Sequence, residues 1–328
     1  MRAGAGTPSP RKFRTSSRID IRRPAPQASE NTGADVAALS VSELVLPTTR
    51  VRFVFSARSD VGRERKVNED SFIAQAPVFF VADGMGGHAH GDAASQTVAR
   101  VFDEHIARDA PSTPERILDA IHSSNDAVRD LSAVDDYGTA VSGTTLAGVA
   151  FVDAGDDVGF HWMAFNIGDS RVYTWDGRTL VQLSVDHSAV QELVDAGLIS
   201  QDEAEQHPER NVITRAIGAD ESVDADVWLL PAAGRHSFLI CSDGLTKELG
   251  TGEIEALLAS YDGNAEPDRS LADVLVDAAL ARGGHDNVTV VYVESVLGNP
   301  EQDDPANTSE RATGVHEHLE DTRPRSQG

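Results

Sequence analysis

The stretch Val78-Phe-Phe-Val-Ala-Asp-Gly-Met-Gly-Gly-His88 joins a short apolar run to an aspartate, three glycines and a histidine. An apolar run of this length, followed by glycines, is typical of a fully buried strand. Asp83 stands where that strand should end, and Gly84 beside it allows the backbone to approach a ligand closely. The stretch therefore predicts a buried strand whose end carries a candidate site.

Three further segments place an aspartate near the end of an expected strand, with glycine next to it in the first two and two residues before it in the third. They are Asn166-Ile-Gly-Asp-Ser-Arg171, Cys241-Ser-Asp-Gly-Leu245 and Gly283-Gly-His-Asp-Asn-Val-Thr-Val-Val291. One Asp-Gly pair alone is an ordinary turn, but four such segments in one chain favour a shared site. Carboxylates, a carbonyl and waters are the ligands of Mg²⁺ and Mn²⁺. If Asp83, Asp243 and Asp286 converge, their mutual repulsion calls for a cation.

The hydrophobic pattern around these segments mixes two periods. Val51, Phe53 and Phe55 alternate as in a half-buried strand, whereas the apolar residues of 94–105 recur at helical spacing. Thr113-Pro114 predicts the start of a second helix. We expect further strands at 145–151, 158–167, 171–183, 226–230, 236–241 and 287–294, helices at 252–260 and 270–282, and short polar helices within 188–219. The clustered strands favour an α+β fold with antiparallel sheets over βαβ units.

Composition divides the 328-residue chain into three parts. Residues 1–50 are rich in Pro, Ser, Ala, Gly and Arg, and we expect a mostly disordered basic segment. Residues 297–328 predict a disordered acidic tail, and residues 51–296 form one patterned block without an internal repeat.

The net charge of −25 argues against nucleic acid and anionic membranes as partners. No apolar run is long enough to span a bilayer. The N-terminus lacks the apolar core of a secretory signal, and the single cysteine, Cys241, suits a reducing compartment. We therefore expect a cytoplasmic protein.

The ordered set of motifs resembles the bacterial metal-dependent protein phosphatases, the PPM family or type 2C Ser/Thr phosphatases. The match covers about residues 51–296, and the set as a whole is far more specific than any one motif. It consists of Arg65-x-x-x-Glu69-Asp70, Ala82-Asp-Gly-Met-Gly-Gly-His88, Ser142-Gly-Thr-Thr145, Gly168-Asp-Ser-Arg171, Asp186-His-Ser188, Ser242-Asp-Gly-Leu245 and Asp286-Asn287. The resemblance implies a four-layer αββα sandwich of two antiparallel sheets flanked by helix pairs. It also implies a dinuclear metal site at one end and a flap subdomain at about 186–219.

The resemblance also implies residue roles. Asp83 corresponds to the aspartate that bridges two Mn²⁺ or Mg²⁺ ions, and the carbonyl of Gly84 to a ligand of the second ion. Asp243 and Asp286 complete the shell of the first ion, and Asp169 with Asp243 holds a third, weaker one. The remaining assignments are Glu69 and Asp70, which order metal-bound waters, and Asn211, which adds a ligand from the flap.

The reaction that this family implies is attack of a metal-bridging hydroxide on the phosphorus of a phosphoserine or phosphothreonine. Arg65 corresponds to the arginine that binds phosphate, although Arg63 and Lys66 are neighbouring alternatives. His88 is the candidate acid for the leaving alkoxide, and its alternative is an exposed loop histidine. His285, just before Asp286, either tunes the metal or stays outside its shell.

We therefore expect a monomeric protein phosphatase that opposes Ser/Thr kinases and acts on phosphorylated proteins, with no nucleic-acid or membrane partner. Two alternatives stay open from sequence. One is a catalytically inactive relative that binds phosphoproteins, and the other is a PPM phosphatase dedicated to an anti-sigma-factor antagonist.

Overall fold

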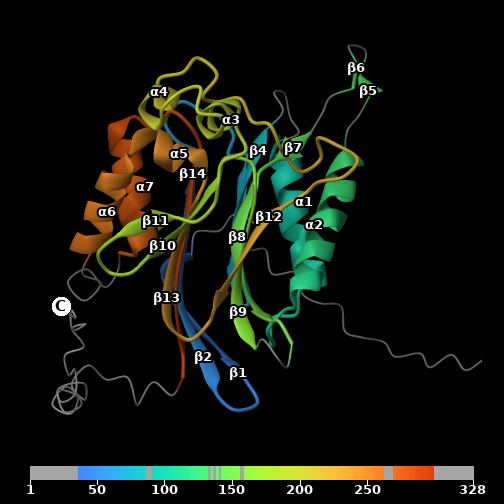
Figure 1. Cartoon of the computed structure of the whole chain (residues 1–328), viewed down its shortest axis with the longest axis vertical. Helices are drawn as coiled ribbons and strands as arrows, with labels where there is room; N and C mark the ends of the chain where they lie inside the picture. The colour runs from blue at the N-terminus through green and yellow to red at the C-terminus, as the bar shows by residue number, and fades with distance from the viewer. Residues whose placement is uncertain are drawn as a thin grey trace, which may run out of the picture. The chain divides into compact units, whose positions relative to one another are not determined.

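Two antiparallel sheets pack face to face, and helices cover the outer face of each (Figure 1). The computed structural model describes residues 36–85, 91–131, 134–135, 138–139, 142–155, 159–261 and 269–298. Separate buried apolar clusters fill the space between the sheets and the space under each helical layer. The layers therefore run helix, sheet, sheet, helix, and the expected α+β sandwich is confirmed.

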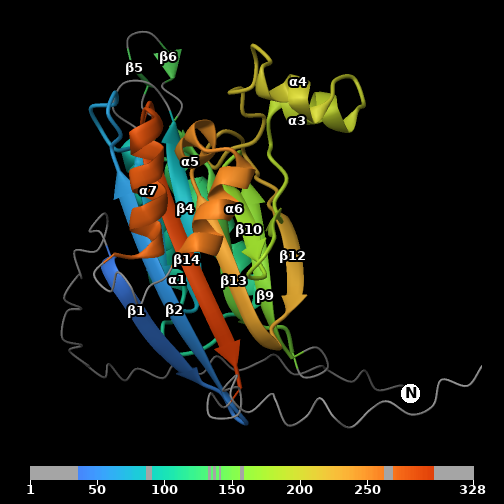
Figure 2. The ribbon, with the colours of Figure 1, turned by 90° about the vertical axis from the view of Figure 1, so that its left-hand side faces the viewer.

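The first sheet has six strands, and each neighbouring pair is antiparallel. Their order is β1 (Val36–Val45), β2 (Arg50–Asp60), β14 (Val288–Leu297), β13 (Gly234–Cys241), β10 (Arg171–Trp175) and β11 (Leu180–Gln182). Its helical layer consists of α5 (Asp243–Glu248), α6 (Thr251–Ser260) and α7 (Leu271–Arg282). Figure 2 shows α7 lying along β2 and β14.

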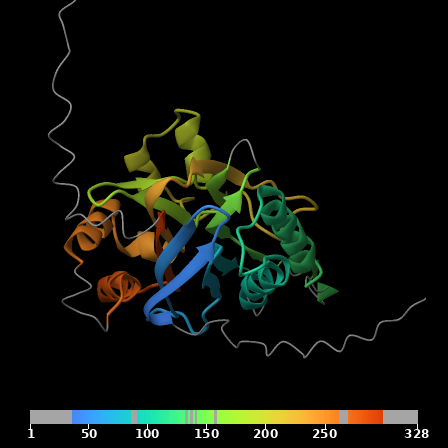
Figure 3. The same ribbon diagram turned by 90° about the horizontal axis from the view of Figure 1, so that it is seen from below.

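The second sheet has a main path of five strands. Their order is β12 (Asp226–Pro231), β9 (Phe160–Ile167), β8 (Leu146–Asp153), β4 (Val78–Met85) and β3 (Asp70–Gln75), and the short strand β7 (Gly143–Thr144) pairs with β4. A separate ribbon joins β5 (Val134–Asp135) to β6 (Gly138–Thr139). Helices α1 (Gly91–His105) and α2 (Pro114–Arg129) cover this sheet, on the side away from α6 and α7 (Figure 3). Thr113 caps α2 and Pro114 occupies its first turn, as predicted.

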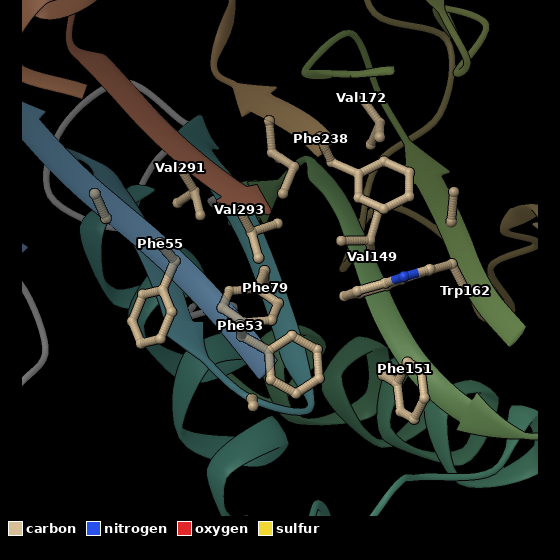
Figure 4. Close-up of a cluster of buried hydrophobic side chains, with 14 of the residues drawn as sticks. Phe53, Phe55, Phe79, Val149, Phe151, Trp162, Val172, Phe238, Val291 and Val293 are labelled. Atoms are coloured by element: carbon tan, nitrogen blue, oxygen red, sulfur yellow. The ribbon is translucent and has the colours of Figure 1, made fainter. Parts of the chain in front are cut away.

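The core between the sheets is aromatic (Figure 4). The ring of Phe53 lies 5.8 Å from those of Phe151 and Trp162, edge to face with both. Trp162 is fully buried, and its indole N–H donates to Ser295 Oγ at 3.1 Å. Since truncating such a side chain typically costs about 3–5 kcal/mol, this core fixes how the two sheets face each other.

Among the elements longer than three residues, three differ from the sequence-based expectation. Strand β1 lies inside the segment that was expected to be mostly disordered, so the folded domain begins before residue 51. Its inward Leu44 is buried while Leu39 and Val41 are exposed, and these outward apolar side chains conceal the alternation. Strand β3 and the short helix α5 were not predicted either. Strand β3 begins and ends with polar residues and α5 is short, so neither shows a clear hydrophobic period in the sequence.

The expected flap, residues 186–219, contains two short helices, α3 (Ala189–Asp195) and α4 (Gln201–Glu205). The backbone closes the base of this segment, because Ala189 N donates to Val212 O and Thr214 N donates to His187 O, both at 2.9 Å. Figure 1 shows both helices at the end of the sandwich where β4 finishes and α5 begins. The segment is therefore anchored next to the aspartate motifs.

Among the described residues, no helix is both long and apolar enough to cross a membrane.

Candidate metal centre

Asp83 lies near the end of β4, and two buried threonines hold its backbone in place. The amide of Asp83 donates to Thr145 Oγ1 at 3.0 Å, and its carbonyl accepts from Thr145 N and Thr144 Oγ1, both at 2.9 Å. Thr145 Oγ1 also lies 2.7 Å from Ser170 Oγ, next to Asp169. The Ser142-Gly-Thr-Thr145 motif thus connects two of the candidate ligands.

Gly84 lies where three segments meet closely. Its amide donates to Glu69 O at 3.1 Å, and a Cβ at this position would collide with the carbonyls of Glu69 and Gly91. A larger residue would push β4 away from β3 and from the start of α1. Gly84 is therefore required for the approach that brings Glu69 beside Asp83.

Asp243 begins α5 immediately after β13. Ser242 fixes the junction, because its amide donates to Thr289 O at 3.0 Å and its hydroxyl accepts from Thr289 N at 2.9 Å. Gly244 packs against the carbonyl of Asn287 so closely that a Cβ would overlap it. These contacts hold Asp243 next to the segment that carries Asp286.

The aspartates are crowded. Burial raises the pKa of Asp83 well above its usual range, and the nearby carboxylates of Asp70, Asp243, Asp169 and Asp286 raise it further. Burial likewise raises the pKa of Asp70 and of Asp169 to about 7 each, with Asp243 adding to both. The sequence-based convergence of the aspartates is thus present in the structure.

Unpartnered carboxylate oxygens mark the same cluster. Oδ1 of Asp70, of Asp169 and of Asp243 is buried and has no hydrogen-bond partner within the part of the chain that the structure describes. A buried acceptor without a partner is costly, and a hard divalent cation with its waters would satisfy such oxygens. The donor set therefore fits Mn²⁺ or Mg²⁺. As the side chains stand among the described residues, however, no three His, Cys, Asp or Glu form a ready cation-binding group.

Two side-chain cations lie on Asp286. Arg65 holds its carboxylate in a fork, with Nε 2.9 Å from Oδ1 and Nη2 3.0 Å from Oδ2. Lys247 Nζ lies 3.0 Å from Oδ2 and also 2.5 Å from Asp243 Oδ2. Burial opposes ionisation of Asp286, but Lys247 and Arg65 outweigh it and hold the pKa below its usual range.

The two acidic residues expected to order waters differ in setting. Asp70 accepts a 2.6 Å hydrogen bond from Thr289 Oγ1. Glu69 is fixed through its backbone, since its amide donates to Asn287 Oδ1 at 2.9 Å. Burial raises the pKa of the Glu69 carboxyl. Both residues border the aspartate cluster, and their role in ordering metal-bound waters stays a prediction.

Asp169 sits in a loop secured from the flap side. Gly168 has a φ of +99°, and its amide donates to His187 Nδ1 at 3.0 Å. Two residues after Asp169, Arg171 holds Asp186 in a fork, with contacts of 2.7–3.0 Å. The flap therefore begins at a charged anchor directly beside a candidate ligand.

Of the other candidate residues, Asn211 and His285 are described, and neither is drawn into the cluster. His88 lies outside the described residues, so its proton-donor role stays a prediction. Asn211 is exposed in the turn after α4. His285 is exposed and directed to Glu248, whose Oε1 lies 2.7 Å from its Nδ1.

Sequence reasoning missed the residues that position the ligands. Thr144, Thr145, Ser242 and Asn287 all lie inside the quoted motifs, yet no role was assigned to them. Lys247 was not singled out at all. Its one available signal was its position, four residues after Asp243, which places both on one face if the segment is helical.

With this geometry established, comparisons with known proteins identify the class. The protein phosphatase 2C family model matches residues 62–277. The chain is 37% identical over 249 residues to the serine/threonine phosphatase stp of Listeria welshimeri, covering 73% of this chain and 95% of that protein. The crystal structure of the Mycobacterium tuberculosis serine/threonine phosphatase PstP/Ppp superposes with a TM-score of 0.62 at 35% identity, covering 74% of this chain and 97% of the other.

A further neighbour is the catalytic domain of the serine/threonine protein phosphatase PstP in complex with two manganese ions. It is 33% identical, with a TM-score of 0.61, and covers 75% of this chain and 99% of the other. Fold and motifs thus define a metal-dependent protein phosphatase. The chain belongs to the protein phosphatase 2C family, which confirms the resemblance inferred from its motifs.

Proposed function

We propose that this protein is an active phosphatase that removes phosphate from phosphoserine and phosphothreonine in proteins and opposes Ser/Thr protein kinases. The observation that carries the proposal is the cluster of crowded aspartates with unpartnered oxygens, bordered by Arg65. Kinship with named serine/threonine phosphatases supports the substrate class.

Two Mn²⁺ or Mg²⁺ ions are the cofactors that fit this donor set. In this proposal Asp83 would serve both ions, the carbonyl of Gly84 would be a ligand of one, and Asp243 and Asp286 would be ligands of the other. Asp169 with Asp243 is the proposed site of a third ion. When bound, such ions supply Lewis-acid stabilisation of the phosphate and acidify a coordinated water.

The remaining groups of the chain bind and orient. Arg65 donates to Asp286 through Nε and Nη2. These two contacts fix the orientation of the guanidinium and leave Nη1 available to a phosphate oxygen. The side chain is half exposed, so an incoming phosphoprotein can reach it. His88 is proposed to give a proton to the leaving alkoxide.

The proposed partners are phosphorylated proteins, including Ser/Thr kinases and their substrates, and the proposed state is a monomer. The flap, residues 186–219, is polar and anchored beside the cluster, which suits contact with a phosphoprotein. The free cysteine, Cys241, is buried, which is compatible with the cytoplasmic location that we propose.

The experiment is hydrolysis of p-nitrophenyl phosphate and of a phosphothreonine peptide, each with Mn²⁺ and with excess EDTA. Activity is expected only with the metal. Asp83→Asn should lower turnover at least about 100-fold, because the proposed bridging ligand loses its charge. Asp153→Asn, at the end of β8 that lies away from Asp83, is the matched control and should keep wild-type turnover.

The outcomes separate the alternatives. Substantial turnover in EDTA would refute metal dependence. A folded protein that binds phosphopeptides but hydrolyses neither substrate would support the inactive phosphoprotein-binding alternative. Hydrolysis of one phosphoprotein alone would favour a phosphatase dedicated to a single partner, such as an anti-sigma-factor antagonist.

A further inference from the structure

Lys247 lies between two carboxylates that are proposed to bind metal. Its Nζ is 2.5 Å from Asp243 Oδ2 and 3.0 Å from Asp286 Oδ2. The two aspartates come from different elements, one from the start of α5 and the other from the loop before β14. The ammonium therefore connects two separate elements of the centre and is more than a contact within one helix.

We propose that Lys247 is a built-in counter-cation of the metal centre, which holds Asp243 and Asp286 together without metal and competes with the incoming divalent ion. The inference rests on the proposed ligand roles of these two aspartates. In this arrangement a metal ion that takes Asp243 Oδ2 and Asp286 Oδ2 must displace the ammonium. Lys247 thereby weakens metal binding and stabilises the metal-free protein.

The charge around the two aspartates supports competition. Asp243 Oδ1 is buried and meets no hydrogen-bond partner from the described segments, so Lys247 satisfies only one oxygen of that carboxylate. Asp286 also has Arg65, which keeps it neutralised when Lys247 leaves. Asp243 has no other ion-pair partner among the described residues. Removing Lys247 from the metal-free protein therefore leaves mainly Asp243 without a compensating charge.

The side chain is suited to being displaced. Lys247 keeps 36% of its side chain exposed, against 16% for Asp243 and 19% for Asp286. An ammonium on a flexible four-carbon stem is a mobile point charge, unlike a guanidinium held in a planar fork. The open path to solvent lets the head group leave while the backbone of α5 keeps Asp243 in place.

The test is calorimetric titration of MnCl₂ into the metal-free full-length protein, at fixed pH and ionic strength. Lys247→Met keeps the length of the side chain and removes its charge. It should bind Mn²⁺ about 10-fold more tightly, which corresponds to one charge pair of moderate strength. In EDTA the same variant should melt at a lower temperature than the wild type, because Asp243 then loses its ion-pair partner.

Two controls accompany this variant. Lys247→Arg keeps the charge and should retain an Mn²⁺ affinity near that of the wild type. Arg116→Met removes one positive charge from the exposed side of α2, in the helical layer of the other sheet, and it should leave both measurements unchanged. If Lys247→Met does not fold without metal, Lys247→Gln replaces it.

The result that overturns the inference is unchanged or weaker Mn²⁺ binding by a folded Lys247→Met or Lys247→Gln protein. Asp243→Asn distinguishes this from failure of the proposed function. If Asp243→Asn binds Mn²⁺ as the wild type does, the ligand assignment is wrong and the inference fails with it. If Asp243→Asn weakens binding while the Lys247 variants do not tighten it, the inference alone fails.

Discussion

Asn287 Oδ1 accepts a hydrogen bond from the backbone N–H of Glu69 at 2.9 Å. The amide nitrogen of the same side chain donates to the carbonyls of Val61 at 2.9 Å and Val67 at 3.0 Å. Asn287 is buried, so it holds the whole 61–69 loop against the start of β14 from inside. Since this loop carries Arg65, one amide side chain determines where the proposed phosphate-binding guanidinium stands.

We predict that Asn287→Ala lowers kcat/KM for p-nitrophenyl phosphate at least about 10-fold, because the loop loses three hydrogen bonds of about 1 kcal/mol each. The measurement is steady-state kinetics at saturating Mn²⁺, with urea unfolding to follow stability. Asn125→Ala is the matched control, because Asn125 likewise accepts from Gly218 N at 2.8 Å and donates to Asp220 O at 3.0 Å. For Asn125→Ala we expect a similar loss of unfolding free energy and a much smaller loss of kcat/KM. Equal losses of kcat/KM in the two variants would contradict the positioning role of Asn287.

Arg65 and His88 are expected to respond differently to substrate chemistry. His88→Ala should slow phosphopeptide hydrolysis by about 10²–10⁴-fold and nitrophenyl phosphate hydrolysis much less, because nitrophenolate leaves without a proton. Arg65→Ala should weaken the binding of both substrates and so raise KM more than it lowers kcat, because both substrates carry the phosphate group. The check is kcat and KM for both substrates with both variants. Equal loss on both substrates for His88→Ala would mean that it positions the centre and is not the acid.

His187 should make folding stability depend on pH. Burial lowers the pKa of its imidazole, and Arg215 lowers it further, while Asp226 and Asp186 only partly oppose this. The unfolded chain takes up the proton near pH 6.5, before the folded protein does, so stability falls as pH drops through about 6.5. The loss is at most about 1.4 kcal/mol per pH unit for one group.

Urea unfolding at pH 7.5, 6.5 and 5.5 measures this for the wild type and for His187→Gln. The aspartates with raised pKa act in the opposite direction in the same range, since protonation suits them in the folded state. Only the difference between the two proteins therefore reports on His187. We expect the wild type to lose more stability than the variant on acidification, and parallel curves would rule this out.

The chain ends should differ in importance. Removing residues 1–35 and 299–328 should leave hydrolysis of p-nitrophenyl phosphate largely unchanged, because every candidate ligand lies between them. Extending the first deletion to residue 45 removes β1, uncovers the edge of β2 and takes away the buried Leu44. That protein should be at least about 2 kcal/mol less stable. Equal melting temperatures for the two deletions would show that β1 contributes nothing to the fold.

The sequence alone determined the features that depend on residues close together in the chain. The alternation of Val51, Phe53 and Phe55 placed a strand in the core, and the Asp-Gly segments marked strand ends that meet at one site. Both patterns depend on neighbours within a few residues, so they can be read without the fold. The ordered motifs then predicted the sandwich and its class, and the family match confirms both.

The tertiary structure alone decided which side chains neutralise and position those aspartates. Glu69 and Asn287 are 218 residues apart, and Lys247 and Asp286 are 39 apart. The edge strand β1 likewise depends on its pairing with β2, because its own apolar residues do not alternate cleanly. Contacts of this kind leave no periodic trace in the chain, since they form only when the two sheets and α5 pack together and bring distant charges within reach of each other.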